Sequence, residues 1–513
     1  MNFASPIFLF AFLPLTAALY ALLRKPALKN ALLVAAGLVF YAFGDLRHLP
    51  LLLASCVLHY AVGRWLCACT RGRRAILAGC IVLNLAVLGA YKFFGALPLG
   101  ISFYTFQAIS FVVDVYRTPE SGTKSFWRVL QYLTFFPQLT AGPLMKFSAV
   151  QPYLEARQTT WSDAYDGICR FAGGLFKKVL LSAAAAELAN AVYGQTGYDA
   201  LCAWTGAACY CLQLYFDFSG YSDMAIGLGL LFGVRLPENF RDPYCASSIT
   251  DFWRRWHISL SAWFRDYLYI PLGGSRKGLL RTMGNKMVVF LATGLWHGSG
   301  LTFLLWGVWH GLWSCVETAL KLPQKLRGRW YGHLYALLVI VLGFALFRAA
   351  DLSQAAALMR AMFMGLSANE ACRAALAAAL NADVYENFTD VDYVYAVNPK
   401  LILNPAPISL VTYREMRELS YSGFNVYQEE ALLPVFRVGI PVNIRNVNNP
   451  ACPGTMIVAS RPTDDHAVRV AGIASDKGFT SIYISKYLMN REVGFGRRVL
   501  SILEEEGISY EHT

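Results

Sequence analysis

The sequence predicts an all-α protein that crosses a membrane several times, followed by a small, truncated α/β soluble tail. Hydrophobic residues make up 56% of the 513 residues and charged residues 15%, with a mean hydropathy of +0.40. A soluble domain has about a quarter of its residues charged. Apolar runs long enough to span a bilayer recur up to residue 347, and the composition changes near residue 380. These observations favour a membrane domain joined to a soluble segment.

The apolar runs lie at 5–23, 30–45, 49–69, 75–93, 98–114, 129–145, 165–190, 200–233, 286–300, 301–319 and 333–347. Several are short or interrupted by Gly and Pro, which is typical of re-entrant or broken helices that line a cavity. We therefore expect roughly ten spans. The first run has no basic start and no small-residue cleavage site, so it is interpreted as a retained span rather than a signal peptide.

Basic clusters follow the first, third and fifth runs: Arg24, Lys25 and Lys29; Arg71, Arg73 and Arg74; Arg117, Lys124 and Arg128. Lys and Arg near span ends favour the cytoplasmic side, which predicts an N-terminus outside. The net charge of +12 is interpreted in the same way, as contact with anionic membrane lipids. No nucleic-acid partner is expected.

The twelve cysteines contain no C-x-x-C pair, so we interpret them as small core residues and predict no metal site.

The segment from Asp251 to Trp313 holds His257, His297 and His310 among seven tryptophans. Ionisable groups are costly in hydrocarbon, and those that persist there usually mark a reaction centre or a permeation path. The chemistry is therefore predicted here. His310 follows His297 by thirteen residues, which on one continuous helix directs the two side chains about 140° apart. His310 is accordingly predicted to be accessory.

Two further groups of polar residues stand out. Arg254, Arg255, Arg265 and Asp266 lie on a segment typical of an amphipathic interfacial helix, where Arg could grip the phosphates of an acyl-coenzyme A; snorkelling, or pairing of Arg265 with Asp266, is the structural alternative. A polar strip interrupts the run 200–233, and it consists of Tyr215, Asp217, Ser219, Tyr221, Ser222 and Asp223. Such a strip is expected to face a protein interior or a tunnel.

Beyond residue 380, short β-branched segments alternate with the turn signals NPAP, NNP and CPG, as in soluble α/β sequence. The pattern predicts strand, turn and strand over 468–490 and a helix over 491–507. The segments NADVYENFTDVDYVYAVNPK and GFTSIYISKYLMNREVGFGRRVLSILEEEGISYEHT resemble aspartate kinase. The resemblance assigns 381–465 to the end of its kinase domain and 466–513 to part of its first ACT domain.

In aspartate kinases the TDVD segment lines the nucleotide site, which implies a remnant of that site at Thr389, Asp390 and Asp392. The N-terminal KFGG-type segment and the aspartate-binding loop of that family do not occur upstream, and phosphoryl transfer depends on such positioning parts. We expect no kinase activity. The tail is interpreted as a fragment joined to a membrane enzyme, with a regulatory module as the alternative.

The segments FDFSGYSDMAIGLGLLFGVRLPENFRDPYCASSITDFWRRWHISLSAWFRDYLYIPLGGSRKG and GLWHGSGLTFLLWGVWHG resemble the bacterial, alginate O-acetylase-like branch of the membrane-bound O-acyltransferase family. The resemblance covers residues 1–365 and leaves 366–380 as a junction. It implies a helical membrane bundle in the bacterial inner membrane, with the catalytic histidine at His297 and its partner at His257.

The resemblance implies transfer of an acyl group, expected to be acetyl, from a cytosolic thioester to a hydroxyl of an exported polysaccharide, a cell-wall polymer or a partner protein. Acyl-coenzyme A or another acyl thioester would be a co-substrate, with no bound cofactor, and an extracytoplasmic protein would complete the transfer. The chemistry needs a base and an oxyanion donor, and imidazole titrates near operating pH. A transporter or flippase, and a bifunctional fusion with kinase output, are the alternatives.

Overall fold

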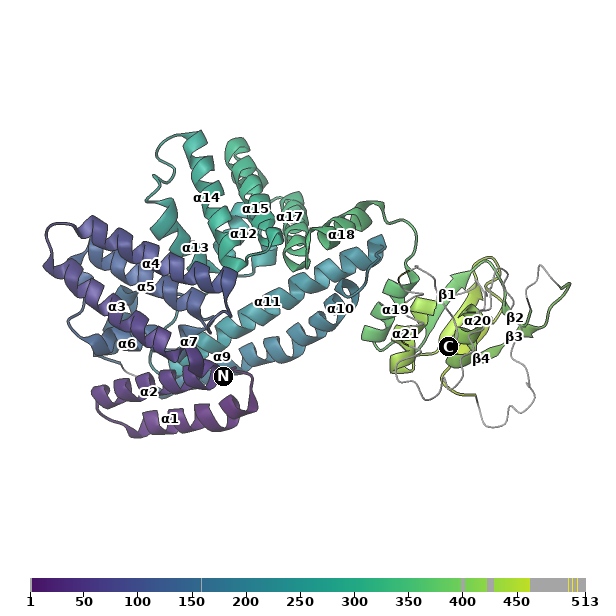
Figure 1. Cartoon of the computed structure of the whole chain (residues 1–513), viewed down its shortest axis with the longest axis horizontal. Helices are drawn as coiled ribbons and strands as arrows, with labels where there is room; N and C mark the ends of the chain where they lie inside the picture. The colour runs from purple at the N-terminus through teal and green to yellow at the C-terminus, as the bar shows by residue number, and fades with distance from the viewer. Residues whose placement is uncertain are drawn as a thin grey trace. The chain divides into compact units, whose positions relative to one another are not determined.

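The computed structural model describes residues 2–157, 159–397, 402–421 and 429–461, with the single positions 497, 501 and 505. The chain divides into two compact units, Met1–Tyr385 and Glu386–Thr513 (Figure 1). The first is helical and the second is a small α/β unit, which confirms the predicted fold class at this level. The predicted strands over 468–490, the helix over 491–507 and the partial ACT domain over 466–513 lie outside the described ranges, apart from those three single positions.

The first half of the helical unit contains η1 (Phe8–Phe12), α1 (Leu13–Leu22), α2 (Pro26–Asp45), η2 (Leu46–His48), α3 (Leu49–Ala68), α4 (Arg73–Phe94), α5 (Ile101–Arg117), η3 (Pro119–Ser121), α6 (Phe126–Thr134), α7 (Phe136–Leu139), α8 (Phe147–Glu155), α9 (Trp161–Phe176), η4 (Lys177–Ser182) and α10 (Ala183–Tyr193). The second half contains α11 (Ala200–Leu231), η5 (Pro243–Cys245), α12 (Ile249–Arg255), α13 (Ile258–Phe264), η6 (Arg265–Tyr269), α14 (Leu279–His297), α15 (Leu301–Leu320), α16 (Leu322–Leu326), α17 (Trp330–Arg348), α18 (Leu352–Met364) and α19 (Glu370–Ala379).

Three of the described helical stretches are long and apolar enough to cross a bilayer: Pro26–Ala68, Arg73–Phe94 and Trp330–Arg348. Large apolar side chains also point outward from this unit, such as Phe94, which is 92% exposed. Such a surface suits lipid rather than water, so this unit is a membrane domain. The total of roughly ten spans stays a prediction. The expected breaks occur at 129–145, where α6 and α7 are separated by an extended residue and followed by a loop.

Close backbone approach holds the long helix α11 against α9. A Cβ added at Gly174 of α9 would lie 2.5 Å from the carbonyl oxygen of Gly220 on α11, and one added at Gly220 would lie 2.7 Å from the carbonyl oxygen of Gly174. Small residues permit this approach between membrane helices, where there is no hydrophobic drive for helix association. On its other flank α11 packs along α10 (Figure 1).

A second helical pair carries the histidine segment. Helices α14 and α15 form a hairpin with α17 beside α15 (Figure 1). A Cβ added at Gly294 of α14 or at Gly307 of α15 would lie 2.5 Å from a backbone carbonyl oxygen of the opposite helix. Glycine at both positions therefore lets the hairpin close directly below His297, the last residue of α14.

The second unit is built on a four-stranded sheet in the order β1-β5-β6-β4. Its described elements are β1 (Tyr385–Thr389), β2 (Val394–Tyr395), β3 (Pro407–Ile408), β4 (Leu410–Thr412), α20 (Tyr413–Tyr421), α21 (Glu429–Val438), β5 (Val442–Asn446) and β6 (Thr455–Val458). Strands β4 and β6 are parallel, β5 is antiparallel to β6, and β2 pairs with β3 as a separate ribbon. Val411, Val442, Ile444 and Ile457 are buried from alternate positions of the strands, as expected for a sheet with one covered face.

Asp199 joins the junction segment to the helical unit. Its carboxylate caps α11 by accepting the Cys202 N–H at 2.8 Å, and it also accepts the Asn369 N–H at 3.0 Å and Arg373 Nε–H at 2.6 Å. Burial opposes ionisation of Asp199, but these bonds outweigh it and hold its pKa below the ordinary value. The ionised carboxylate thus anchors α19 against the start of α11.

Replacing Asp199 with alanine is expected to lower the melting temperature of the full chain in detergent, because loss of an N-cap alone costs about 1 kcal/mol. Asp351→Ala, which removes the single capping bond of α18 to Gln354, should cause a smaller decrease. Since the Asp199 pKa is lowered, its stabilisation is complete above the ordinary carboxyl pKa and disappears as pH falls through the folded value. The difference in melting temperature between wild type and Asp199→Ala should therefore become smaller in acid. A difference in melting temperature that does not change with pH would contradict this account.

Candidate active site

His257 occupies the turn between α12 and α13. It adopts a left-handed backbone conformation with φ of 45°, which is uncommon for a residue with a side chain. Its side chain is buried, with 2% exposed, and its ring packs edge-on against Phe218 at 4.6 Å between centroids. Burial, and to a smaller extent His297, lowers the pKa of His257 well below its ordinary value. The imidazole is therefore neutral.

The carboxamide of Asn239 orients His257. Asn239 Oδ1 accepts hydrogen bonds from Ser259 N–H at 3.1 Å and Ser259 Oγ–H at 3.0 Å, and it lies 3.3 Å from His257 Nδ1. Asn239 Nδ2 donates to Ser222 Oγ at 3.1 Å. An amide oxygen only accepts, so the contact assigns the proton to Nδ1 and leaves Nε2 with a free lone pair. His257 Nε2 is buried and has no hydrogen-bond partner among the described residues.

The rings of His297 and His257 both contact the indole ring of Trp296. The Trp296 ring packs against His297 at 4.8 Å and against His257 at 6.3 Å between centroids. The His297 ring also contacts Trp306 and Phe347, each at 5.2 Å. Within the described chain no hydrogen bond involves this imidazole, which is half-buried. The structure thus brings together the two histidines predicted to be catalytic, which are 40 residues apart in the chain (297 − 257).

His310 is closer to this centre than the helical angle predicts. The chain breaks after His297 at Gly298–Gly300 and resumes as α15, so the expected separation of about 140° does not apply. His310 is fully buried, and its ring lies 5.2 Å from Trp306, the same indole that contacts His297. Neither of its ring nitrogens has a partner in the described part of the chain.

Unpaired donors surround the histidines. The indole N–H groups of Trp253, Trp296 and Trp306 are buried and have no acceptor among the residues that the structure describes. Buried polar groups are normally paired, so each exception needs an explanation. Three unpaired indole donors and unpaired imidazole nitrogens thus belong to one cluster of contacting rings. Such groups are complementary to a substrate with carbonyl and hydroxyl oxygens.

Glu317 fixes the helix that leads into His257. Its carboxylate is fully buried, and it accepts the Ile249 N–H at 2.5 Å and the Thr250 N–H at 2.8 Å, both at the start of α12. A negative charge there satisfies free N–H groups and favours the helix dipole. Sequence reasoning missed Glu317 and Asn239. The PENF segment, which contains Asn239, could have been recognised as a motif. No local sequence pattern, however, shows that Asn239 contacts His257.

The arginines predicted to grip a donor differ in their surroundings. Arg254 is exposed, and Arg255 pairs with Asp251 at 3.0 Å on α12. Arg265 pairs with Asp266 at 2.8 Å, the structural alternative raised above. Asp266 also accepts from Lys146 at 2.7 Å. Burial raises the pKa of Asp266, but both cations outweigh it and the net pKa is lowered.

The two carboxylates of the polar strip of α11 pair with cations of α9 and η4. Asp217 forms an ion pair with Lys178, and Asp223 accepts from Arg170 at 2.7 Å and from Lys177 at 2.6 Å. Tyr215 packs among aromatic rings that include Trp256, at 6.4 Å, next to His257 in the chain. The structure therefore places Asp217 in an ion pair with Lys178 and Tyr215 at the edge of the site.

The predicted nucleotide remnant in the tail lies at the end of β1. Thr389 is the last residue of β1, and its Oγ1–H donates to the Val391 carbonyl at 3.3 Å. Asp392 Oδ1 accepts from Asn446 Nδ2 at 2.7 Å and from Asn449 Nδ2 at 3.2 Å, and Asp390 is exposed. Asp392 thus holds the loop after β5.

Comparisons with known proteins assign both parts. Residues 101–325 match the membrane-bound O-acyltransferase family, and residues 352–446 match the amino acid kinase family. The "Probable alginate O-acetylase AlgI" of Azotobacter vinelandii is 41% identical over 394 residues, which covers 71% of this chain and 78% of that protein. The chain belongs to the membrane-bound O-acyltransferase family. Its membrane unit is an O-acyltransferase.

Other relatives agree with this family assignment. The "Peptidoglycan O-acetyltransferase" of Helicobacter pylori is 34% identical, covering 72% of this chain and 81% of that protein. The tail is 65% identical over 137 residues to "Aspartokinase 3" of Bacillus subtilis, covering 27% of this chain and 30% of that protein. The predicted resemblance to aspartate kinase is confirmed.

Asn239→Ala is expected to reduce acyl transfer on the order of a hundredfold, because a misplaced catalytic group costs about that much. The control is Asn84→Ala, which removes another buried carboxamide, bonded to His59 and Cys80, and should lower the melting temperature while preserving turnover. Rates measured on full-length protein in detergent test this. Equal rates for wild type and Asn239→Ala would show that Asn239 does not position His257.

Proposed function

We propose that this membrane O-acyltransferase moves an acyl group, expected to be acetyl, from a cytosolic thioester to a hydroxyl of an exported polysaccharide or cell-wall polymer. The observation that carries the proposal is the packing of one indole, Trp296, against both His257 and His297 in a chain of this family. Relatives are named for O-acetylation of alginate and of peptidoglycan, which supports a polymeric acceptor. The donor is acyl-coenzyme A or another acyl thioester.

In the proposed reaction His297 acts as the general base. The acceptor hydroxyl gives its proton to the His297 imidazole while its oxygen attacks the thioester carbonyl carbon. A carbon–oxygen bond forms, the carbon–sulfur bond breaks, and the departing thiolate takes up the proton from His297. General-base assistance of this kind contributes about a hundred- to ten-thousandfold in rate.

The neighbouring groups have separate roles. With Nδ1–H directed at Asn239, neutral His257 offers Nε2 as an acceptor, which suits a second hydroxyl of a sugar acceptor. The free indole N–H groups of Trp296 and Trp306 suit the oxygen on which charge develops, and such preorganised donors are usually the largest contribution to acyl transfer. His310, Arg254 and Arg255 are accessory residues, and Tyr215 lines the edge of the site; Asp217 is proposed to act only in packing.

The proposal also includes the membrane location and orientation of the protein. The protein is a multi-pass protein of a bacterial inner membrane with its N-terminus outside, in contact with membrane lipids. The donor approaches from the cytosol, and an extracytoplasmic protein completes transfer to the polymer. The basic clusters after the first, third and fifth apolar runs support this orientation.

His297→Ala is expected to reduce transfer of labelled acetyl from acetyl-coenzyme A to alginate or peptidoglycan at least about a hundredfold. The melting temperature should fall only slightly, because the ring loses its contacts with Trp306 and Phe347 but no described hydrogen bond is lost. His333→Ala, at an exposed position of α17, is the matched control and should retain full activity. A transporter predicts the opposite: polymer translocation that persists in His297→Ala, without acetyl transfer by wild type.

The full chain is expected to show no ATP-dependent phosphorylation of aspartate. The tail corresponds to 30% of the aspartokinase that it resembles, and phosphoryl transfer depends on phosphate-positioning parts that its sequence lacks. A coupled ADP-release assay with and without aspartate tests this, with aspartokinase as the positive control. Aspartate-dependent ADP release above background would establish the bifunctional alternative.

A further inference from the structure

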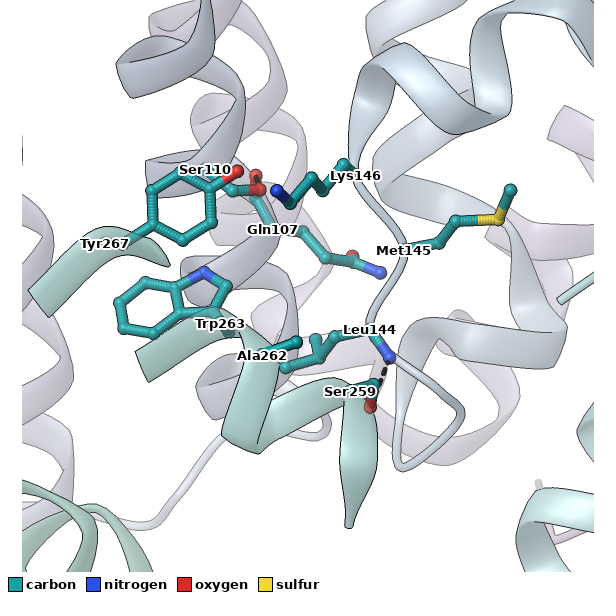
Figure 2. Close-up of a pocket in the computed structure, with 9 residues that line it drawn as sticks. All are labelled: Gln107, Ser110, Leu144, Met145, Lys146, Ser259, Ala262, Trp263 and Tyr267. Carbon is teal, nitrogen blue, oxygen red and sulfur yellow. Dashed lines mark hydrogen bonds between the residues drawn. The ribbon is translucent and has the colours of Figure 1, made fainter. Parts of the chain in front are cut away.

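A small cavity lies between α5, the segment 144–146, α13 and η6 (Figure 2). Its volume is about 40 Å³, and it is lined by Gln107, Lys146, Ser259, Trp263 and Tyr267 among others. This space is enough for one small polar group rather than a large molecule, since holding one water takes at least about 10–15 Å³ of such volume. Only one functional group of a longer ligand fits inside it.

Gln107 provides the chemical character of the cavity. Its side chain is 1% exposed, and neither its Nε2 nor its Oε1 has a hydrogen-bond partner among the described residues. Figure 2 shows the carboxamide directed between Lys146 and Leu144. A buried unpaired amide costs free energy, because it has lost its water without replacement. One donor and one acceptor side by side are complementary to a secondary amide of a ligand.

The wall opposite Gln107 is rigid. The Trp263 ring stacks on Phe106 at 3.9 Å between centroids, and its Nε1–H donates to the Phe106 carbonyl at 2.9 Å. The Tyr267 hydroxyl donates to the Asp114 carboxylate at 2.9 Å. Tyr267 lies in η6, a π-helical turn, and such turns are frequent at functional sites.

The rim of the cavity is cationic. Lys146 Nζ pairs with Asp266 at 2.7 Å but stays 44% exposed, and Arg117 donates to the Asp266 backbone carbonyl at 2.9 Å. Arg265 pairs with the same carboxylate. Lys146 and Arg265 thus share the single carboxylate of Asp266, while Arg117 bonds a backbone carbonyl and Asp114 bonds the Tyr267 hydroxyl. Three cations against two carboxylates leave an excess of positive charge at the rim. Arg117 belongs to a cluster predicted to be cytoplasmic, so the rim lies on the predicted donor side.

The far wall of the cavity leads to His257. Ser259 Oγ accepts the Leu144 N–H at 3.0 Å and donates to Asn239 Oδ1 at 3.0 Å. The same oxygen accepts from His257 Nδ1. The cavity and the catalytic imidazole are therefore positioned by one carboxamide.

We infer that the cavity binds an amide of the phosphopantetheine arm of the acyl donor, with Gln107 paired to that amide and Lys146 on the phosphate side. This rests on the proposed function, because it is the donor subsite of the same reaction. The arm combines secondary amides, a phosphate at one end and the thioester at the other, which matches the amide, the cationic rim and the path to His257. Coenzyme A and acyl carrier proteins share this arm.

The test compares Gln107→Leu and Lys146→Met in the full chain with three donors: acetyl-coenzyme A, acetylated acyl carrier protein, and S-acetyl-N-acetylcysteamine, which has an amide but no phosphate. Gln107→Leu should raise KM about tenfold for every donor that wild type uses, with kcat within twofold and an unchanged or higher melting temperature. Lys146→Met should raise KM about fivefold for the two phosphate-bearing donors only.

Two controls separate binding from folding. Gln131→Leu replaces a buried glutamine that donates to Asn30 at 3.1 Å and should lower the melting temperature with KM unchanged. Lys325→Met replaces an exposed lysine of α16 and should change neither. The inference is overturned if Gln107→Leu leaves KM within twofold for all donors, or if it lowers the melting temperature as Gln131→Leu does.

Equilibrium binding of coenzyme A and of holo acyl carrier protein, without turnover, distinguishes failure of the donor subsite from failure of the proposed function. If wild type transfers no acyl group but binds either arm tenfold more tightly than Gln107→Leu, the proposed function fails and the subsite stands. If wild type transfers acetyl with a KM indifferent to Gln107, the subsite fails and the proposed function stands.

Discussion

A polar group buried in a membrane protein must find its partner inside the protein, because lipid offers none. This constraint organises the helical unit. Asn239 satisfies it for three elements at once, since its carboxamide joins Ser222 of α11, Ser259 of α13 and the His257 ring. One side chain thereby sets the tautomer of the imidazole and the position of a cavity wall. This hub fixes the His257 side of the proposed site, whereas His297 is held by its contacts with aromatic rings.

The same constraint separates structural polar groups from functional ones. Glu317, Asp223 and Asp199 carry carboxyl groups that are largely buried, and each has several donors around it. They hold helices in place: α12 before His257, α9 along α11, and α19 beside the start of α11. By contrast His257 Nε2, Trp296 Nε1 and the Gln107 carboxamide have no described partner. Leaving these hydrogen-bonding groups unpaired costs free energy, which is explained if a bound substrate forms hydrogen bonds with them.

The α/β unit follows different rules. Its sheet pairs β4 with β6 in parallel and β5 with β6 in antiparallel fashion, and its buried Val and Ile side chains alternate along the strands. This is the pattern of a soluble domain in water, not of a chain in lipid. The segment matches 30% of the length of an aspartokinase. Asp392 stabilises its fold by bridging two asparagines.

The sequence by itself determined the membrane class, the two-part organisation and the family, because composition and motifs such as WRRWH and LWHG are local properties of the chain. It pointed to His257 and His297 for the same reason. Only the tertiary structure decided their surroundings. Asn239 is eighteen residues from His257, and Gln107 meets a wall supplied by residues more than thirty positions away. The break after His297 turns the chain back so that Trp306, which contacts His310 on its own helix, also contacts His297. Hydrogen bonds between distant segments depend on how helices pack, and no local pattern encodes that packing.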